Sequence, residues 1–354
     1  MIKEEIDAAV RRVIRSGRLI LGKEVEEFER SFALSCGCEY GIGVNSGTDA
    51  LHLALRAIGV VDGDEVITVP NTSPATVSAI LQAGAKTVLI DIEEASYLMD
   101  VNRLRRAITQ RTKAIMPVHL FGQMAEIKPL LELADKVHLP IIEDCAQAHG
   151  ASFDGKVSGS FGKMGCFSFY PTKNLGAYGD AGIIVTHDPQ LAERLKMLRI
   201  YGFSKKSYSE FFGVNSRLDE LQAAILSTKL RHLDAWNRKR RHLASLYIQQ
   251  LSPLPITLPH ELKERKHVYH LFVIRLKHRD ALRQYLFDRG IMTDIHYPTP
   301  IHMQPGFRSL GYKQGDFPVS EQVQSEILSL PMFPELKEEE VREVCRHILT
   351  FFSS

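Results

Sequence analysis

The sequence lacks the features that mark membrane, secreted and nucleic-acid-binding proteins. No stretch approaches the ~20 consecutive apolar residues that a membrane-spanning helix needs. Residues 1–17 carry charges throughout, unlike a signal peptide. The formal net charge is only +2, so no excess of positive charge points to nucleic acid. We therefore expect its partners to include neither a membrane nor a nucleic acid.

Cysteine is scarce, and it follows no pattern. The chain has five cysteines, and none of them forms a CxxC pair. An odd number of scattered cysteines in a long chain indicates reduced thiols, and we expect a cytoplasmic protein. We expect no metal site, because a strand through His267 and His270 would point the two rings to opposite faces.

Short apolar runs alternate with helical stretches between residues 44 and 185. Such alternation is typical of βαβ units, which build a mostly parallel sheet covered by helices. We therefore predict an α/β fold whose large domain is a mostly parallel αβα sandwich. The expected strands are 65–69, 86–90, 114–118 and 140–143, and the expected helices are 49–58, 74–83 and 127–136.

The pattern changes after Cys166. Two strands, 166–170 and 182–186, flank a glycine-rich loop, and one long helix is expected over 218–251. A strand at 267–276 and helices at 279–289 and 337–351 are enough for a small α+β domain. With 354 residues, 44% of them hydrophobic, the chain can form two cores. We therefore expect a large domain over residues 1–235, with an amphipathic N-terminal helix, and a small C-terminal domain over residues 236–354.

The segment Ser46-Gly47-Thr48-Asp49 follows an apparent strand and opens a helix. Small residues there expose backbone N–H groups at the positive end of the helix, which favours a bound phosphate. Ser, Thr and Asp are also ordinary helix caps, so a purely structural role is the alternative.

Two carboxylates, Glu143 and Asp144, end a buried apolar strand. Ligands of open α/β sheets bind at this edge. An acid there could pair with a cationic ring nitrogen, bind a metal or cap a helix. The residue types alone leave these three roles open.

Lys173 lies in the loop after the strand at 166–170, and no acidic residue is beside it. Desolvation lowers the pKa of a lysine and makes its neutral amine available as a nucleophile. The alternative is an exposed surface lysine. A further segment, Asn215-Ser216-Arg217, leads into a helix. Its Asn and Arg side chains could reach phosphate oxygens or could simply belong to a helix start.

Together these segments meet the needs of one cofactor, pyridoxal 5'-phosphate (PLP). PLP needs a phosphate anchor, an acid against its pyridine nitrogen and a lysine for its aldehyde. The acid keeps the ring nitrogen protonated, so the ring can accept electrons, and the freed lysine can move a proton. The segment at 46–49, Asp144 and Lys173 supply these three requirements.

The chain resembles the DegT/StrS-type family of nucleotide-sugar aminotransferases, which belong to the fold-type I PLP enzymes. The likeness runs through nearly the whole sequence, and so many motifs in one order are specific. The matching segments are 16–22, 46–51, 117–122, 143–150, 169–176, 215–220 and 296–298.

The resemblance implies particular roles. The phosphate would be bound by Gly47, Thr48 and Ser168, the pyridine nitrogen by Asp144, and the ring face or its 3-hydroxyl by Gln147. Lys173 would carry the cofactor as a Schiff base. Asn215 would reach the phosphate of the neighbouring subunit's cofactor, so the active unit would be a homodimer.

The resemblance also suggests a substrate. The loop at 174–182 is similar to that of relatives that aminate C3 of a keto-sugar, whereas relatives that aminate C4 more often carry a Thr-Thr-Gly-Glu-type loop. We therefore expect glutamate as donor and a dTDP-linked 3-keto-6-deoxyhexose as acceptor, with C4 amination as the alternative. The candidate substrate residues are His296, Tyr297, Arg217 and Tyr178, with His302 and Arg308 as further candidates for a pyrophosphate or sugar site and simple packing as the alternative for both histidines.

One departure from the family pattern concerns the loop after Val69-Pro70, where many relatives place an aromatic residue that stacks on the pyridine ring. Residues 71–74 include no aromatic, so either a smaller group packs there or the match shifts by one residue. Two other functions are conceivable. A PLP dehydratase of this family would have histidine in place of Lys173, and a non-catalytic regulatory or sensory protein would not need Lys173 or Asp144.

Overall fold

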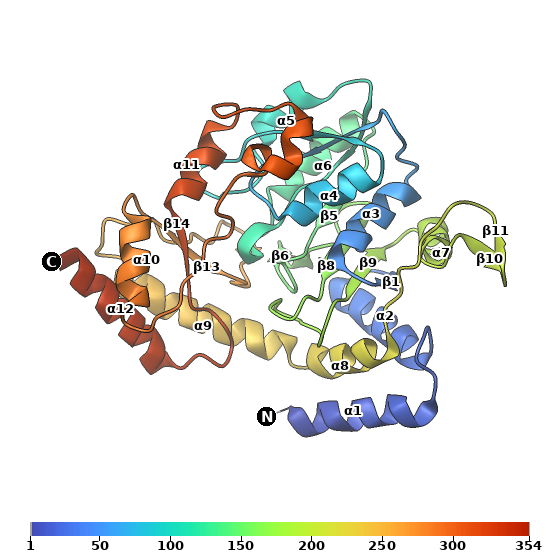
Figure 1. Ribbon diagram of the computed structural model, residues 1–354, viewed down its shortest axis with the longest axis horizontal. Helices are drawn as coiled ribbons and strands as arrows, with labels where there is room; N and C mark the ends of the chain where they lie inside the picture. Colours follow the sequence, from blue (N-terminus) through green and yellow to red (C-terminus); the bar gives the residue numbers. More distant parts are fainter. Residues whose placement is uncertain (1, 354) are drawn as a thin grey trace.

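A mostly parallel sheet forms the centre of the computed structural model, which describes residues 2–353 (Figure 1). Two parallel bridges, Ile115 to Ile141 and Val118 to Asp144, join a three-stranded sheet to a four-stranded one. The combined order is β3-β2-β4-β5-β8-β9-β1, in which β9 alone runs against its neighbours. The strands are β1 (Tyr40–Val44), β2 (Glu65–Thr68), β3 (Lys86–Leu89), β4 (Thr112–Ile115), β5 (Ile142–Asp144), β8 (Met164–Ser168) and β9 (Gly182–Thr186).

Helices cover both faces of this sheet, as the sequence pattern predicts. In β9, Ile184 packs into one hydrophobic cluster, and its neighbours Ile183 and Val185 pack into another, because successive strand residues face opposite ways. The helices are α1 (Lys3–Ser16), α2 (Lys23–Cys36), α3 (Gly47–Ala57), α4 (Pro74–Gln82), α5 (Val101–Ala107), α6 (Ile127–Lys136), α7 (Pro189–Leu198), α8 (Glu220–Leu230), α9 (Leu233–Leu251), α10 (Arg279–Phe287), α11 (Pro318–Glu326) and α12 (Glu338–Ser353), with 3-10 turns η1 (Leu120–Gly122), η2 (Ile301–Met303) and η3 (Pro305–Leu310).

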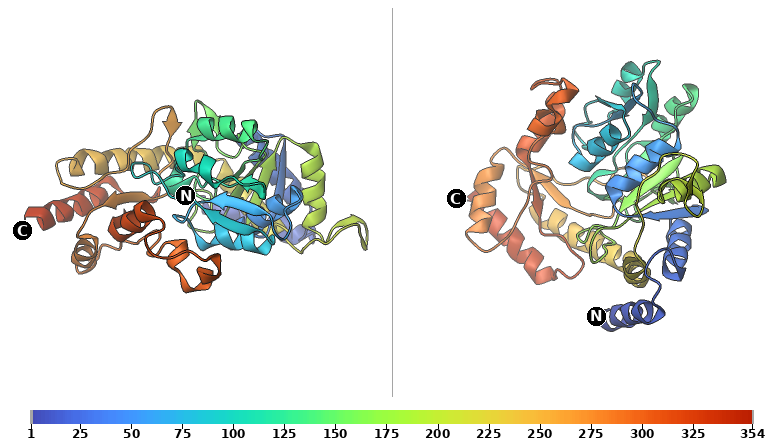
Figure 2. Two further views of the ribbon diagram at one scale, coloured as in Figure 1. Left: turned by 90° about the horizontal axis from the view of Figure 1, so that it is seen from above. Right: turned by 45° about the vertical axis from the view of Figure 1, so that its right-hand side comes forward.

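The C-terminal elements, coloured orange and red, lie to one side of the sheet in both views of Figure 2. There α10 packs beside a two-stranded antiparallel sheet of β13 and β14, and α12 packs on α10. One buried cluster continues from α2 into α12, so the two regions share a core. We keep the division at residues 235/236 as a proposal. The remaining strands are β6 (Ser152–Phe153), β7 (Lys156–Val157), β10 (Phe203–Lys205), β11 (Tyr208–Ser209), β12 (Arg265–Lys266), β13 (Phe272–Arg275) and β14 (Ile327–Leu330).

The single helix predicted over 218–251 is wrong, because the chain breaks between Leu230 and Leu233. The break lets α8 pack on α1 and α2 while α9 packs along α12 (Figure 1). The strand predicted over 267–276 is wrong in its first half. There the backbone pairs with η1 instead, since Val268 N donates to Gly122 O at 2.9 Å, and Tyr269 takes a positive φ of 42°.

A buried carboxylate ties α2 to α8. Glu220 accepts hydrogen bonds from the backbone N–H groups of Gly22 (2.6 Å), Glu24 (3.1 Å) and Val25 (3.0 Å). These groups lie at the start of α2, where N–H groups have no partner inside the helix. A side chain distant in sequence therefore caps α2. Within residues 2–353, no helix combines the length and apolar character that crossing a membrane requires.

Removing this cap should destabilise the fold. Glu220→Ala leaves three N–H groups near α2 without their acceptor, and we expect the free energy of unfolding to fall by about 2–3 kcal/mol. Urea denaturation followed by circular dichroism measures the change. The exposed Glu210 provides the matched control, Glu210→Ala. Equal stability of the two variants would show that the cap contributes nothing.

Candidate active site

A cradle of free backbone N–H groups lies where α3 meets β8. Ser46 caps α3 by accepting from Asp49 N (3.1 Å), and Ala50 N donates to Ser46 O (3.0 Å). The N–H groups of Gly47 and Thr48 therefore have no acceptor among the described residues, and both residues line a cavity of about 360 Å³. A Cβ at Gly47 would lie 2.5 Å from Ser168 Cβ, so only glycine allows this close approach. The capping interpretation is correct for Ser46, and the free N–H groups of Gly47 and Thr48 are available to an anion.

The two carboxylates at the end of β5 have different surroundings. Glu143 lies inside the fold and accepts from the N–H groups of Gly159, Phe161 and Gly162 and from His119 Nε2 (2.9 Å). Burial alone would raise the pKa of Glu143, but the hydrogen bonds from His119 and these N–H groups hold it below its ordinary value. Glu143 is thus an ionised structural group.

The side-chain ligand atoms of His119, Glu143 and Cys145 lie within 4.8 Å of one another, a spacing that a metal ion could bridge. His119 Nδ1 already accepts from Ala125 N (3.1 Å), which places its proton on Nε2, and Nε2 donates to Glu143. Burial raises the pKa of the Cys145 thiol well above its usual value. The ring nitrogens of His119 are thus both occupied by hydrogen bonds, and we assign no metal to this cluster.

The side chain of Asp144 points away from that of Glu143 and lines the same cavity as Gly47 and Thr48. Thr76 Oγ1 donates to its Oδ2 at 2.8 Å, and Ala146 N donates to its Oδ1 at 3.1 Å. Burial raises the pKa of Asp144 above its ordinary value, and these hydrogen bonds and the charge of Lys173 only partly oppose that rise. A cation placed against this carboxylate would restore its charge.

Lys173 lines the same cavity from the loop between β8 and β9. Its backbone N–H donates to Tyr170 O (2.8 Å), which closes a turn and presents the side chain inward. Burial of the amine lowers the pKa of Lys173 to about 8, although Asp144 acts in the opposite sense. The sequence alone could not exclude a surface lysine, and the fold excludes it.

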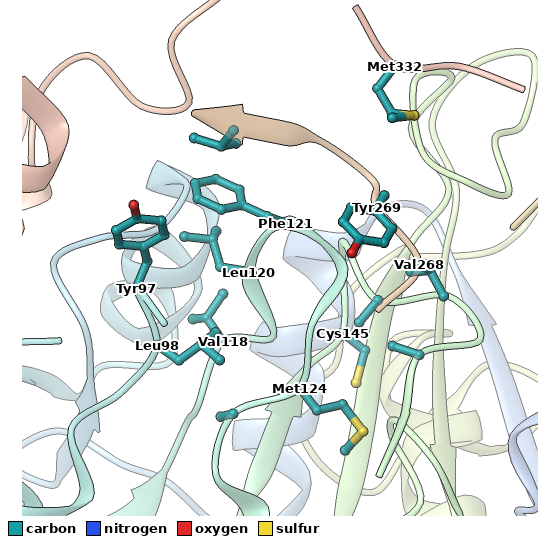
Figure 3. Packing of buried hydrophobic residues seen from close by; sticks show 14 of the residues in the cluster. Tyr97, Leu98, Val118, Leu120, Phe121, Met124, Cys145, Val268, Tyr269 and Met332 are labelled. Atoms are coloured by element: carbon teal, nitrogen blue, oxygen red, sulfur yellow. The ribbon is translucent and has the colours of Figure 1, made fainter. Parts of the chain in front are cut away.

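Gln147 and Tyr297 form one wall of this cavity. Gln147 Oε1 accepts from Phe121 N (2.7 Å), and its Nε2 donates to the hydroxyl oxygen of Tyr297 (3.1 Å). Tyr297 is also hydrogen-bonded to Ser73, which lies in the loop without an aromatic residue. The loop at 71–74 thus lies beside the aromatic ring of Tyr297, which comes from a distant part of the chain. Phe121, whose backbone N–H donates to Gln147, packs near Tyr97 in the hydrophobic core, where Figure 3 shows both rings.

A second cavity, of about 640 Å³, opens on the other side of Lys173. Tyr178 lines this cavity, and His296 borders both. The residues that the two cavities share are Thr172, Lys173, His270 and His296. Lys173 thus lies between two adjoining cavities, and each cavity can hold part of a ligand.

Four predicted residues do not line either cavity. Asn215 is exposed near the cradle, because the adjacent Ser216 donates to Asp49 Oδ2 (2.6 Å), and Arg217 is half-buried beside it. His302 is buried and paired with Glu321 at 2.9 Å, and Arg308 is exposed in η3. The packing interpretation of His302 is therefore the better one.

Sequence reasoning missed Thr76, which orients Asp144, and His270, which borders both cavities. Thr76 lies in an unremarkable helix, α4, so no local signal marks it. His270 could have been noticed only if the run at 267–271 had been recognised as irregular.

The family of this protein follows from a sequence match along nearly the whole chain. The model of the DegT/DnrJ/EryC1/StrS aminotransferase family matches residues 1–349. The chain belongs to this family. The dTDP-3-amino-3,6-dideoxy-alpha-D-galactopyranose transaminase of Aneurinibacillus thermoaerophilus is 49% identical over 342 residues, which cover 97% of this chain and 94% of the relative. A pleiotropic regulatory protein of Geobacillus stearothermophilus is 46% identical over 354 residues, covering 99% and 95%.

Solved structures of the family agree with the fold. DesV of S. venezuelae, crystallised in complex with a ketimine intermediate, superposes with a TM-score of 0.97 at 45% identity and covers 99% of this chain and 95% of its own. NtdA of Bacillus subtilis, crystallised with bound cofactor PMP, gives 0.93 at 33% identity, covering 99% and 82%. The predicted fold class is confirmed, and the chain has the fold of these aminotransferases.

The lowered pKa of Lys173 has a measurable consequence. Its amine should react with an amine-selective ester in proportion to its neutral fraction, which rises with pH through a midpoint near 8, whereas surface lysines have a midpoint of about 10.4. Mass spectrometry of the labelled peptide, after hydroxylamine has removed any aldehyde bound to the lysine, gives the midpoint. Asp144→Asn should lower it further, because the carboxylate favours the charged amine. A midpoint near 10 in the native chain would contradict the buried placement.

Proposed function

We propose that this member of the aminotransferase family uses PLP to move an amino group from glutamate to C3 of a dTDP-linked 3-keto-6-deoxyhexose. The observation that carries the proposal is the cavity lined together by Gly47, Thr48, Asp144, Ser168 and Lys173. These residues offer an anion cradle, a carboxylate and an amine, which are the three groups that PLP requires.

The residues fit the cofactor in kind and in placement. Free N–H groups at the start of α3, with the hydroxyls of Thr48 and Ser168, would hold the phosphate. Asp144 would hold the cationic ring nitrogen, and Thr76 keeps its carboxylate oriented. Lys173 would hold the aldehyde carbon, and its lowered pKa leaves part of the amine neutral near pH 7. When bound, PLP supplies an electron sink for the carbon that carries the transferred nitrogen.

Lys173 is the residue that we propose moves the proton. A general base works best with a pKa near the operating pH, and burial brings the pKa of Lys173 to about 8. It lies between both cavities, so it can serve the space that holds the cofactor and the space beside it. Water is limited there by Tyr297, Gln147 and Leu120, which close one wall.

The second cavity is where we place the sugar. It borders Lys173 and offers both hydrogen-bonding and aromatic side chains, including Tyr178, His296 and Trp236. The C3 preference rests on the loop at 174–182 and on the product named for the Aneurinibacillus relative. C4 amination is the alternative, and a panel of 3-amino and 4-amino nucleotide sugars distinguishes the two.

A homodimer is part of the proposal. Asn215 is exposed, and its neighbour Ser216 is hydrogen-bonded to Asp49. The side chain of Asn215 is therefore available to a neighbouring subunit. We propose that it reaches the partner's phosphate site. All five cysteines are free thiols, which supports a cytoplasmic location for the enzyme.

A regulatory role is the competing function, since one relative is named a pleiotropic regulatory protein. A regulator without catalysis would not need an amine with a lowered pKa or an acid buried in the same cavity. Lys173 and Asp144 both lie there, which favours the enzyme.

The proposed reaction predicts a spectral response. The purified protein should absorb visible light through a cofactor bound to Lys173, and glutamate should shift this absorbance as the amino group transfers. Lys173→Ala should lose turnover by at least about 10³-fold, whereas the exposed Lys163 provides a control, Lys163→Ala, with normal turnover. An unchanged spectrum of the native protein with both glutamate and glutamine would refute the aminotransferase.

The role of Asp144 is tested by Asp144→Asn, which keeps the size of the side chain but removes the charge. We expect a loss of activity of at least about 10²-fold, because the ring nitrogen loses its anionic partner. Asp154→Asn is the control, since Asp154 is exposed and its φ of 47° suits asparagine. Steady-state rates with glutamate and the amino-acceptor sugar measure the effect. Near-normal rates for Asp144→Asn would reject this acid as the ring partner.

A further inference from the structure

His270 has an unusual position among the buried side chains. It borders both cavities, beside Lys173, although only 6% of the residue is exposed. The proposed reaction does not use it. Its two ring nitrogens have different surroundings, and these surroundings fix what each nitrogen can do.

Two backbone carbonyls determine the orientation of the neighbouring amides. Asn174 Nδ2 donates to Val268 O (3.1 Å), and Asn237 Nδ2 donates to His149 O (2.8 Å). A carbonyl oxygen can only accept, so each Nδ2 must be the atom that faces it. Asn237 Oδ1 then accepts from Asn174 Nδ2 (2.8 Å), in agreement with both assignments.

The amide orientation fixes the histidine tautomer. Asn174 Oδ1 faces His270 Nδ1 at 3.0 Å, and an amide oxygen can only accept. His270 Nδ1 must therefore carry the proton. Burial, together with the nearby charges of Lys173 and Arg240, lowers the pKa of His270 well below its usual value, so the ring is neutral and Nε2 holds a lone pair.

His270 Nε2 has no hydrogen-bond partner in the part of the chain that the structure describes, and it is not among the unpartnered polar atoms sealed from solvent. Since the residue borders both cavities, this nitrogen opens onto the space next to Lys173. A bare lone pair with no N–H can only accept a hydrogen bond. It favours a ligand group that donates one, and it gains nothing from an ether or keto oxygen.

We propose that His270 Nε2 accepts a hydrogen bond from a substrate hydroxyl on a carbon next to the reacting keto carbon, and that Asn174 and Asn237 hold the ring in the tautomer this requires. The inference rests on the proposed function, because it assumes a keto-sugar beside Lys173. Apart from its reacting nitrogen, the amino donor glutamate has only carboxylates, which cannot donate a hydrogen bond, so His270 should act on the sugar alone. It is thus a specificity-determining residue for the sugar half of the reaction.

Two substitutions separate the two nitrogens. His270→Asn retains an amide that can donate to Asn174 Oδ1 but has no atom at the Nε2 position. His270→Gln places an amide oxygen near the Nε2 position, so it should restore part of the acceptor. The exposed His278 provides the matched control, His278→Asn.

The experiment compares the keto-sugar with its two analogues that lack one hydroxyl next to the keto carbon. Without glutamate the holoenzyme binds these ligands but does not turn them over, so calorimetry gives dissociation constants. The native enzyme and His278→Asn should prefer the full substrate to one of the analogues by at least about tenfold. In His270→Asn this preference should fall below about threefold, and in His270→Gln it should lie between the two.

The glutamate half-reaction, followed by the spectral change, should be slowed less in His270→Asn than the half-reaction with the sugar. An unchanged preference in His270→Asn would overturn the proposal, and so would a native enzyme that does not distinguish any of the three sugars. Equal slowing of both half-reactions would assign His270 to the support of Lys173 instead. Failure of the native enzyme to respond to either glutamate or glutamine would be a different result, because it would reject the aminotransferase itself.

Discussion

The hydrogen bonds to the Glu143 carboxylate are the constraint on which the site depends. This carboxylate gathers the turn at 159–162 and His119 around the end of β5. The same strand end joins the two parts of the sheet, since Asp144 N donates to Pro117 O and Cys145 N donates to Cys166 O. Fixing Glu143 on one side of β5 therefore fixes Asp144 on the other. Gln147 follows this strand end by three residues, so the same constraint positions the cavity wall that Gln147 forms with Tyr297.

Much of the site could be predicted from the sequence because its signals are local. A helix start with small residues, an acid at a strand end and a lysine in a glycine-rich loop can each be recognised within a few residues. The different roles of Glu143 and Asp144 could not be predicted, because these roles depend on which face of β5 contacts the turn at 159–162. Thr76 and His270 were missed for a similar reason, since their roles come from partners 68 and 96 positions away in the chain.

The fold was predicted best where strands are buried on both faces and worst where the chain leaves the sheet. The strand at 182–186 matches β9 in both bounds, because its apolar run has no other stable arrangement. The segment at 267–271 also contains apolar residues, yet its backbone bonds to η1. The break between α8 and α9 has no glycine or proline to mark it, and it is set by the two surfaces that those helices cover.

Burial shifts the pKa values of Asp144 and Lys173 in opposite directions, and the result explains why this cavity suits a charged ligand. The pKa of the acid is raised and that of the amine is lowered to about 8, so each group carries less charge than it would in water. A ligand with a cationic nitrogen at one end and an electrophilic carbon at the other would relieve both penalties together. The same low polarity keeps His270 neutral, and the amides of Asn174 and Asn237 then decide which of its nitrogens faces the ligand. One physical condition, exclusion of water around Lys173, would thus set the chemistry on one side of the lysine and the selection of the sugar on the other.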